Sequence, residues 1–357
     1  MTIREMAQVA SPWLNGSGEH SESVVSSRVR LARNIGGLPF PHRATPKDLA
    51  CSLEAARRAL SGSAALKTGT WLVMSDLDDL ERQFLVERHL ISQEHAEKSS
   101  TRAVVVSDNE MISAMVNEED HLRLQAIQSG FQVMDAWRLL ERLDGETDEK
   151  IKYGFSAEWG YLTACPTNTG TGLRASMLVH LPALVLTGQI NKVLHGISQM
   201  GLAVRGFYGE GSDVMGNLFQ VSNRTALGVS EIDIIQSLEK VVRQVLDYEA
   251  QAKQILLRDA RSQIEDKVWR AYGILKYCRK VSSQEVMSLG SAVRLGKALG
   301  VVDSISIAGL NNLLLASQPA HVQKRFDREM DAAERDIVRA DMVRRLMAEE
   351  EARTSAG

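Results

Sequence analysis

The sequence is short of cysteine and has no long apolar run, and each absence excludes a class of protein. Its three cysteines, Cys51, Cys165 and Cys278, are too few and too scattered for a disulfide framework or a zinc site. No segment approaches the ~18 uninterrupted apolar residues of a membrane span. The N-terminal stretch MTIREMAQVASPWLNGSGEHSES contains no apolar signal core. We therefore expect a cytoplasmic protein in a reducing compartment, without membrane contact.

Neither sign of charge dominates the chain. Its 42 Lys and Arg residues and 45 Asp and Glu residues give a formal net charge of −3. No global basic field therefore favours direct binding to nucleic acid. The 357 residues, 44% of them hydrophobic, suffice for a sizeable core, and length alone predicts about two domains.

Strands are predicted to dominate the chain between Thr101 and Asn223. β-branched and apolar runs separated by short Gly, Asn and Asp turns predict strands at 70–77, 102–117, 121–130, 158–166, 174–181, 202–210 and 217–223. Helical patterns occur at 46–60, 78–92, 135–143 and 181–200. Thr45 and Asp48 form a capping box that opens the first of these helices. Strands this close in sequence favour an α+β fold, an antiparallel sheet with helices packed against it.

The pattern becomes helical after Gly228. Ser230 with Asp233 opens a long helical run over 234–278, and Ser282 with Glu285 opens the next helix. We expect three regions: a loosely held polar arm over 1–22, an α+β domain over 23–252 and an all-α domain over 253–357.

Arginines recur in the predicted strands. Arg28 and Arg30 are two residues apart in VVSSRVRLARN, which places both side chains on one face of a strand. Taken alone, this pair is better explained by an exposed edge strand kept soluble by basic residues. Arg123, Arg174 and Arg205 are also in strand patterns. Such a set suits a polyphosphate ligand, because a guanidinium makes planar, bidentate contacts with phosphate oxygens.

The common phosphate-binding motifs are absent. The sequence has no GxxxxGK[ST] loop and neither an HRD nor a DFG motif. This excludes a P-loop enzyme and a protein kinase of the Ser/Thr/Tyr type.

Acidic residues gather in NEEDHLRLQ, which begins at Asn117. Glu118, Glu119 and Asp120 follow an apolar, β-branched stretch, so we expect them in a turn at a strand end. A carboxylate cluster next to Arg123 can hold a cationic substrate beside an anionic one. Glu210 is flanked by glycines in RGFYGEGSD. Such an acid is often only a turn residue, but with Glu119 it would make a carboxylate pair.

Cys165 and two histidines are weaker signals. Cys165 precedes a Gly- and Thr-rich turn in TACPTNTGTGLRAS, where the backbone could approach a ligand. A lone cysteine is more often a buried small hydrophobic residue, although a cation such as Arg174 nearby would lower the pKa of its thiol. His89 and His180 occur singly in apolar patterns, for which a core or surface position is the default.

Four of these motifs, SSRVR, NEEDHLR, CPTNTGTGLRAS and RGFYGE, resemble in this order the ATP:guanido phosphotransferases, the family of arginine kinase and creatine kinase. The resemblance extends from Ser23 to about residue 252. It implies the catalytic-domain fold of these phosphagen kinases, a glutamine-synthetase-like antiparallel sheet flanked by helices. It also implies ATP as phosphoryl donor and Mg²⁺ held mainly by the nucleotide, without protein ligands to the metal.

The resemblance implies roles for individual residues. Glu119 and Glu210 hold the substrate guanidinium, Glu119 as the base, and Cys165 lies beside it. The five arginines bind the phosphates and His89 lies near the nucleotide. The implied nucleotide-binding set is Ser26, Ser27, Arg28, Val29, Arg30, His89, Arg123, Arg174, Ala175, Ser176, Met177, Leu178, Arg205, Gly206, Phe207, Tyr208, Gly209 and Glu210. Leu178 stands where the small-molecule arginine kinases have a histidine, so we expect different contacts to adenine.

Two departures indicate a branch of that family. SSRVR begins at Ser26, so we expect the protein to lack the N-terminal domain of about a hundred residues that closes over a free guanidine in the small-molecule kinases. A helical C-terminal region containing RDIVRA follows instead. Both features resemble the bacterial protein-arginine kinases, whose substrate is an arginine side chain in a protein. That branch implies an allosteric phosphoarginine site at Arg335, Asp336, Ile337, Val338, Arg339 and Ala340. The alternative for this helix is a solvated face rich in ion pairs.

The same resemblance implies partners. They are an McsA-type zinc-containing activator, a CtsR-type heat-shock repressor as substrate, a Clp unfoldase or protease that reads the mark, phosphoarginine as effector, and a homodimer or higher oligomer. Two other functions stay open. A kinase for free arginine or another small guanidine is disfavoured by the missing domain. A non-catalytic adaptor is disfavoured by the intact Glu119, Glu210 and arginines.

Overall fold

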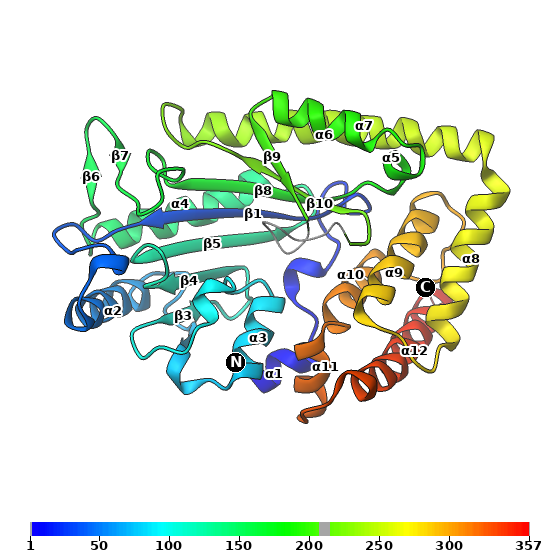
Figure 1. The fold of residues 1–357 in the computed structure, drawn as a ribbon, viewed down its shortest axis with the longest axis horizontal. Coiled ribbons are helices and arrows are strands. Elements are labelled where there is room, and N and C mark those ends of the chain that lie inside the picture. The colour runs from blue at the N-terminus through cyan, green and yellow to red at the C-terminus, as the bar shows by residue number, and fades with distance from the viewer. Residues whose placement is uncertain (1, 207–214, 357) are drawn as a thin grey trace.

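The computed structural model describes residues 2–206 and 215–356. Among these residues, eight antiparallel strands form one sheet in the order β2-β3-β4-β5-β1-β8-β10-β9 (Figure 1). The strands are β1 (Val24–Arg33), β2 (Thr70–Val73), β3 (Ala103–Val106), β4 (Ile112–Val116), β5 (Leu122–Ser129), β8 (Leu173–His180), β9 (Leu202–Arg205) and β10 (Leu218–Asn223). A small separate hairpin consists of β6 (Phe155–Ser156) and β7 (Gly160–Tyr161).

Helices flank this sheet and continue beyond it. They are α1 (Ile3–Gln8), α2 (Pro46–Ser61), α3 (Asp79–Glu87), α4 (Val133–Asp148), α5 (Pro182–Leu186), α6 (Ile190–Gln199), α7 (Glu231–Asp259), α8 (Arg261–Tyr277), α9 (Ser283–Ala298), α10 (Ile307–Ala316), α11 (Pro319–Phe326) and α12 (Ala332–Ala356). Short 3₁₀ turns are η1 (Pro12–Leu14), η2 (Pro41–Arg43), η3 (Met74–Asp76) and η4 (Glu94–Ala96). None of the described helices is both long enough and apolar enough to cross a bilayer. The predicted α+β fold is confirmed.

The two faces of the sheet differ because side chains alternate along each strand. One face is the core face, where Val29, Leu124 and Met177 are fully buried and where α4 and α7 pack across the central strands. The opposite face carries the polar residues of the same strands, and we call it the open face. Two apolar clusters cover parts of the open face, one formed with α1, α3 and α11 and one with η1, α9 and α10.

Strand β1 lies in the middle of the sheet, paired with β5 on one side and β8 on the other. The prediction that Arg28 and Arg30 share a face is confirmed, since both project onto the open face. The explanation by an exposed edge strand is wrong, because both edges of β1 are hydrogen bonded. Solubility of an edge strand therefore does not explain Arg28 and Arg30.

The N-terminal residues are packed, and the expectation of a loosely held arm is wrong. Ile3 and Met6 are buried against α3, and Trp13 is 1% exposed. Ser11 donates a hydrogen bond to the buried Glu110 at 2.9 Å. The polar composition of this segment concealed a few large apolar side chains that anchor it.

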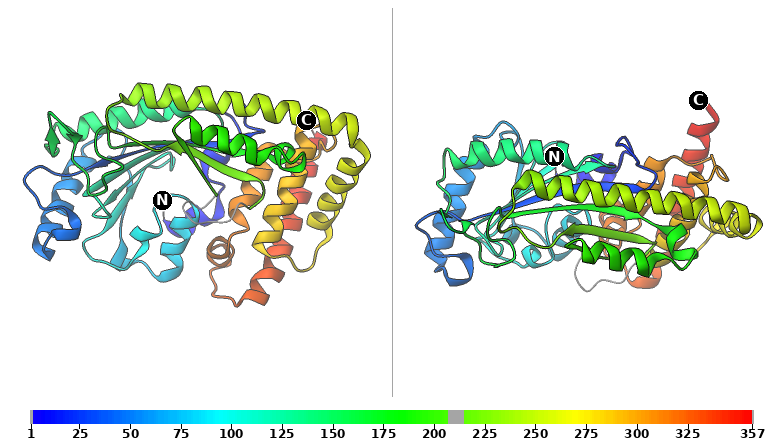
Figure 2. Two further views of the ribbon diagram at one scale, coloured as in Figure 1. Left: turned by 45° about the horizontal axis from the view of Figure 1, so that its top comes forward. Right: turned by 90° about the horizontal axis from the view of Figure 1, so that it is seen from above.

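The C-terminal helices adjoin one end of the sheet (Figures 1 and 2). Helix α7 runs along the core face, passes residue 252 and ends at Asp259, and the chain turns at Ala260 into α8. Val268 and Val343 of this region belong to the same buried apolar cluster as the strands. The predicted boundary at residue 252 therefore falls inside one helix, and the helical region shares its core with the sheet.

Three other element predictions need correction. The strand at 158–166 is reduced to Gly160–Tyr161, and the strand at 102–117 is a hairpin of β3 and β4. The helix at 181–200 is split at Gly188, whose φ of +70° is left-handed, into α5 and α6.

Candidate active site

The strands gather the predicted arginines on the open face. The register pairs Arg30 with Arg174 on one side and with Gln125 on the other. One step further along, Arg28 pairs with Ser176. Because directly paired residues of an antiparallel sheet project to the same face, the open face carries Arg28, Arg30, Arg123, Arg174 and Arg205. Residues from four strands thus converge on one basic surface.

Among the described residues, Arg28 and Arg30 form no ion pair with a carboxylate, whereas Arg123 does. Arg123 forms an ion pair with the buried Glu118, and Arg28 donates from Nε to Oε1 of the neutral Gln125 at 2.6 Å. Arg30 has a buried Nε without a hydrogen-bond partner in the described part of the chain. Burial and the neighbouring Arg123 lower the pKa of Arg28 to about 9. Burial and the neighbouring Arg28 also lower the pKa of Arg30 well below the ordinary value of an arginine. Such a cluster is costly unless an anion binds to it.

Three acids follow β4 in a tight turn, as predicted, but only one of them is exposed. Glu118 is buried and bonded to Ser92 and Arg123. Burial alone would raise the pKa of Glu118, but Arg123 and Ser92 outweigh it and lower the pKa. Asp120 is buried and accepts from Asn34 at 2.6 Å. Glu119, between them, is exposed and is the carboxylate of this turn that a substrate can reach.

Glu119 has a perturbed acidity. Partial burial and the adjacent Asp120 raise its pKa above the ordinary value of a glutamate. A carboxylate with a raised pKa is a better proton acceptor than an ordinary one when it is ionised. The acidic turn therefore presents one accessible carboxylate with a raised pKa next to the arginine-lined face.

The loop that carries Cys165 is tied to the acidic turn. The backbone N–H of Ala164 donates to Oδ1 of Asp120 at 2.7 Å. This hydrogen bond joins the residue before Cys165 to the residue after Glu119. The half-buried Cys165 has its sulfur 3.0 Å from Oγ1 of Thr167. The predicted partner carboxylate Glu210 lies outside the described residues, as do Phe207, Tyr208 and Gly209, whereas Gly206 is described and buried.

A small cavity opens beside the arginines. Its lining includes five residues of the predicted nucleotide set, Ser26, Arg28, His89, Ser176 and Leu178. His89 has a left-handed backbone, with φ of +59°. Burial and the nearby Arg28 lower the pKa of His89 to about 3, so its imidazole is neutral at physiological pH.

Some predicted residues face away from this cavity, and others were missed. The side chains of Ser27, Val29, Ala175 and Met177 lie on the core face and are fully buried or nearly so; Ser27 donates to the carbonyl of Gly130 at 2.7 Å. The cavity is also lined by Trp13, Ile127 and Gln220. Strand alternation could have identified Ile127 and Gln220, but nothing in the sequence placed Trp13 here.

The RDIVRA motif lies in α12, as predicted, but its second arginine is buried. Arg339 is 2% exposed. Its Nε donates to the carbonyl of Ser317 at 2.6 Å and its Nη1 donates to Val281 at 3.1 Å and to Asp336 at 2.6 Å. Arg335 is half-buried and donates to the carbonyl of Met330 at 2.8 Å. The alternative of a fully solvated face is wrong for Arg339 and also for Ala340, while Ile337 is exposed and Val338 half-buried.

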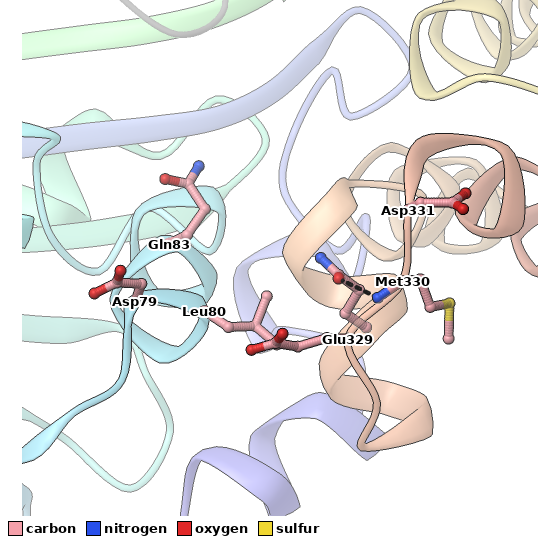
Figure 3. Close-up of a pocket in the computed structure, with 7 residues that line it drawn as sticks. Asp79, Leu80, Gln83, Glu329, Met330 and Asp331 are labelled. Carbon is pink, nitrogen blue, oxygen red and sulfur yellow. Dashed lines mark hydrogen bonds between the residues drawn. The ribbon is translucent and has the colours of Figure 1, made fainter.

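A larger cavity of about 510 Å³ lies between α3 and the segment that connects α11 to α12 (Figure 3). Its lining residues are Asp79, Leu80, Gln83, Gln323, Glu329, Met330 and Asp331. The backbone N–H of Met330 donates to Gln323 at 2.8 Å, and this bond holds the connecting segment against α11. The cavity is acidic and is separate from the arginine-lined face.

Comparison with known families identifies both regions of the chain. Residues 53–252 match the model of the ATP:guanido phosphotransferase C-terminal catalytic domain, and residues 261–356 match that of the protein-arginine kinase McsB C-terminal domain. The protein-arginine kinase of Symbiobacterium thermophilum is 47% identical over 342 residues, covering 95% of this chain and 97% of that one. The protein-arginine kinase of Bacillus subtilis is 41% identical, with 96% and 95% covered.

Solved structures agree with this result. A crystal structure of lombricine kinase has a TM-score of 0.59 and 26% identity, covering 69% of this chain and 70% of that one. The duplicated taurocyamine kinase of Schistosoma mansoni shares the fold, with a TM-score of 0.61 and 24% identity; 66% of this chain matches 34% of that longer one. Over both of its regions, the chain belongs to the ATP:guanido phosphotransferase family, in its protein-arginine kinase branch.

Proposed function

We propose that this enzyme transfers the γ-phosphate of ATP to the guanidinium of arginine side chains in proteins. The observation that carries the proposal is that one exposed carboxylate, Glu119, lies next to a sheet face where Arg30 has a buried Nε without a hydrogen-bond partner among the described residues. A cationic acceptor and an anionic donor can therefore be held side by side. The relatives with the same two regions are protein-arginine kinases.

The chemical problem is to make a guanidinium attack phosphorus. A guanidinium has a pKa above about 12, so it offers no useful lone pair at neutral pH. In the proposal, Glu119 orients its planar fork and accepts a proton as the nitrogen–phosphorus bond forms and the bond from the γ-phosphorus to the bridging oxygen breaks, which releases ADP. Glu210 is the orienting partner and Cys165 lies beside the guanidinium. Arg28, Arg30, Arg123, Arg174 and Arg205 hold the triphosphate in line and offset the charge of the transferring group.

Magnesium belongs to the proposal as part of the nucleotide substrate. Among the described residues, no three His, Cys, Asp or Glu side chains gather as a metal site. The donor set of the basic face suits phosphate oxygens rather than a cation. We therefore expect Mg²⁺ to arrive on ATP, held by phosphate oxygens that the arginines leave free.

The test replaces the proposed base. Glu119→Gln should lower turnover by ~10²–10⁴-fold while ATP still binds, as measured by calorimetry. Glu97→Gln is the matched control, because Glu97 is an exposed carboxylate that forms an ion pair with Arg102; it should keep the parental rate. A Glu119→Gln chain with near-parental turnover would overturn the assignment.

The product and the acceptor are checked in the same assay. Incubation with ATP and either an unfolded protein or free arginine separates a protein kinase from a small-guanidine kinase, and an adaptor would label neither. Phosphoarginine has a phosphorus–nitrogen bond and should be lost in mild acid. Label that survives acid on hydroxyl side chains would exclude arginine phosphorylation.

The C-terminal helices are proposed to bind phosphoarginine, the effector, through RDIVRA, with catalysis assigned to 23–252 and effector binding to 253–357. Arg335 supplies a half-buried guanidinium for the phosphate and Asp336 can accept from the guanidine nitrogens. Arg339 already bonds two backbone carbonyls, so its removal would disturb the fold.

The test therefore uses Arg335→Ala with Asp336→Asn in the full-length chain, titrated with phosphoarginine by calorimetry. We expect binding to be lost and ATP affinity to be kept. Arg345→Ala, an exposed arginine of the same helix, should bind like the parent. Equal binding by all three chains would remove the site from RDIVRA.

Partners and location are proposed from family membership. We expect a cytoplasmic enzyme, as a homodimer or higher oligomer, with an McsA-type activator, a CtsR-type repressor among its substrates and a Clp protease that reads the mark. Recovery of phosphoarginine on the repressor only when kinase and activator are both present would test the first two partners.

A further inference from the structure

Trp13 is set into the nucleotide cavity from outside the sheet. It belongs to η1, is 1% exposed and lines the cavity together with Ser26, Arg28, His89 and Leu178. Its indole ring meets the imidazole of His89 edge to face, with ring centroids 5.6 Å apart and planes at 72°. It packs in one apolar cluster with Ile127 and Leu178 of the strands. The cavity therefore has a basic end at Arg28 and an apolar end at Trp13.

The polar atom of Trp13 is unsatisfied. Its Nε1 is buried and has no hydrogen-bond partner among the described residues. Indole is a donor only, and burying it without an acceptor costs free energy. Trp137 shares this property, but it is packed into the main core under the sheet and does not line the cavity. An unpaired indole N–H in the core does not indicate a ligand site. The unpaired N–H of Trp13 does, because Trp13 lines a cavity.

The strand side chains that pack with Trp13 at the apolar end, Leu178 and Ile127, are hydrocarbon and offer no donor. Gln220 uses one of its two N–H donors on Ser176 Oγ at 3.0 Å. A flat ligand with ring acceptors, held against apolar side chains, would satisfy the Trp13 N–H, and the neighbouring arginines would hold an attached phosphate chain.

We propose that Trp13 recognises the nucleobase of ATP, by donating its indole N–H to a ring nitrogen of adenine. This rests on the proposed nucleotide site. The acceptor is N1, N3 or N7, the ring nitrogens of adenine with an available lone pair. Trp13 is then a specificity residue supplied by the N-terminal segment, at a position where Leu178 offers no hydrogen bond.

The experiment removes the donor and each acceptor separately. Trp13→Phe should raise KM for ATP roughly 3–10-fold, the effect of one neutral hydrogen bond, and leave kcat at saturating ATP within about twofold. For the parental chain, one of the three analogues 1-deaza-, 3-deaza- and 7-deaza-ATP should raise KM by a similar factor. For the Trp13→Phe chain, the KM for that analogue should be no higher than the KM for ATP. Trp137→Phe, which also removes an unpaired indole, should leave KM unchanged.

Two results would overturn the inference. One is a Trp13→Phe chain with parental KM. The other is a parental chain for which no deaza analogue weakens binding, a result that needs no variant to fold. Calorimetric binding of each nucleotide gives the same comparison without phosphoryl transfer. If the proposed reaction is wrong, the parental chain will show no turnover with ATP. The calorimetric comparison of nucleotide binding by the parental and Trp13→Phe chains can still be made.

Discussion

Strand β1 carries arginines on both faces, and their surroundings are opposite. Arg33 is 1% exposed and points to the core face, where it donates to Asp144 through Nη2 at 2.7 Å and to the carbonyl of Thr171 at 2.9 Å. Its guanidinium lies over the ring of Tyr161 at 3.5 Å from the centroid. Arg30, three residues earlier, has a buried Nε without a partner among the described residues. One arginine is structural and the other is available for a ligand.

This contrast predicts opposite effects on stability. Arg33→Met should lower the free energy of unfolding by roughly 3–5 kcal/mol, because it leaves Asp144 buried and unpaired. Arg30→Met should leave the free energy of unfolding unchanged or raise it by about 1–2 kcal/mol, because the substitution removes an uncompensated charge. The same substitution should abolish ATP binding. Denaturant titration and calorimetry check both. Loss of stability in Arg30→Met equal to that of Arg33→Met would contradict the division.

The acidity of Glu119 predicts the pH dependence of the reaction. A base must be ionised to accept a proton, and partial burial with Asp120 raises the pKa of Glu119. As pH falls through that raised pKa, kcat/KM should drop, and the midpoint should lie above the ~4.3 of an ordinary glutamate. A pH–rate profile with saturating ATP gives the midpoint. An acid limb at or below the ordinary value would argue against Glu119 as the base.

The sequence could predict which residue types meet at the site, but not which of the acidic residues a substrate can reach. Three consecutive acids look alike in NEEDHLRLQ. Their difference comes from distant partners: Ser92 and Arg123 bind Glu118, whereas Asn34 and the backbone of Ala164 bind Asp120. Strand alternation correctly placed Arg28 and Arg30 on one face. It could not show that β1 is central, because the order of strands is set by tertiary pairing.

At the scale of elements, α11 depends on a residue of α3. Helix α11 begins at Pro319, and its N-cap residue, Gln318, makes no side-chain capping bond. The carboxylate of Glu87 accepts instead from the backbone N–H groups of Ala320, at 2.9 Å, and His321, at 3.0 Å, and from Nδ1 of His321 at 2.9 Å. A buried acid near the sheet thus caps a helix of the C-terminal region.

Removal of this cap should loosen the contact between the two regions. Glu87→Ala leaves two buried backbone donors and an imidazole without their acceptor, each worth about 1–3 kcal/mol. We expect hydrogen exchange at Ala320 and His321 to rise by at least tenfold and unfolding free energy to fall. The control is Glu329→Ala, an exposed acid just beyond α11, which should change neither. Unaltered exchange at both amides in Glu87→Ala would show that α11 is held by packing alone.

Helix starts were predictable where the cap is local. Thr45, Ser230 and Ser282 each accept from the backbone three residues on, as their spacing indicated. The start of α11 was not predictable, because its acceptor is 233 residues away in the chain. The break between α7 and α8 was missed for a related reason: Ala260 leaves the helical conformation in a sequence without Gly or Pro.

At the scale of the molecule, the two family regions share one buried core. Val268 and Val343 of the helical region cluster with residues of the sheet, and Met287 packs with Ile127 and Leu178 of the strands. Separate unfolding of either region would expose these surfaces to water.

We therefore expect a single cooperative thermal transition, with equal calorimetric and van't Hoff enthalpies. Differential scanning calorimetry of the full-length chain is the measurement. Two resolved transitions, with only one shifted by ATP, would mean that the regions unfold independently despite the shared core.

The central place of β1 has a consequence during protein synthesis. Ser27 of β1 bonds to Gly130, 103 residues later, and the second neighbour, β8, comes later still. At ~5–20 residues per second, ribosomes need about 5–20 seconds to make the first partner. Throughout that interval the nascent chain carries a ten-residue strand with both edges unsatisfied, a template for pairing with neighbouring chains. The kinase that we propose to mark proteins for a Clp protease thus itself exposes an unpaired strand while it is being synthesised.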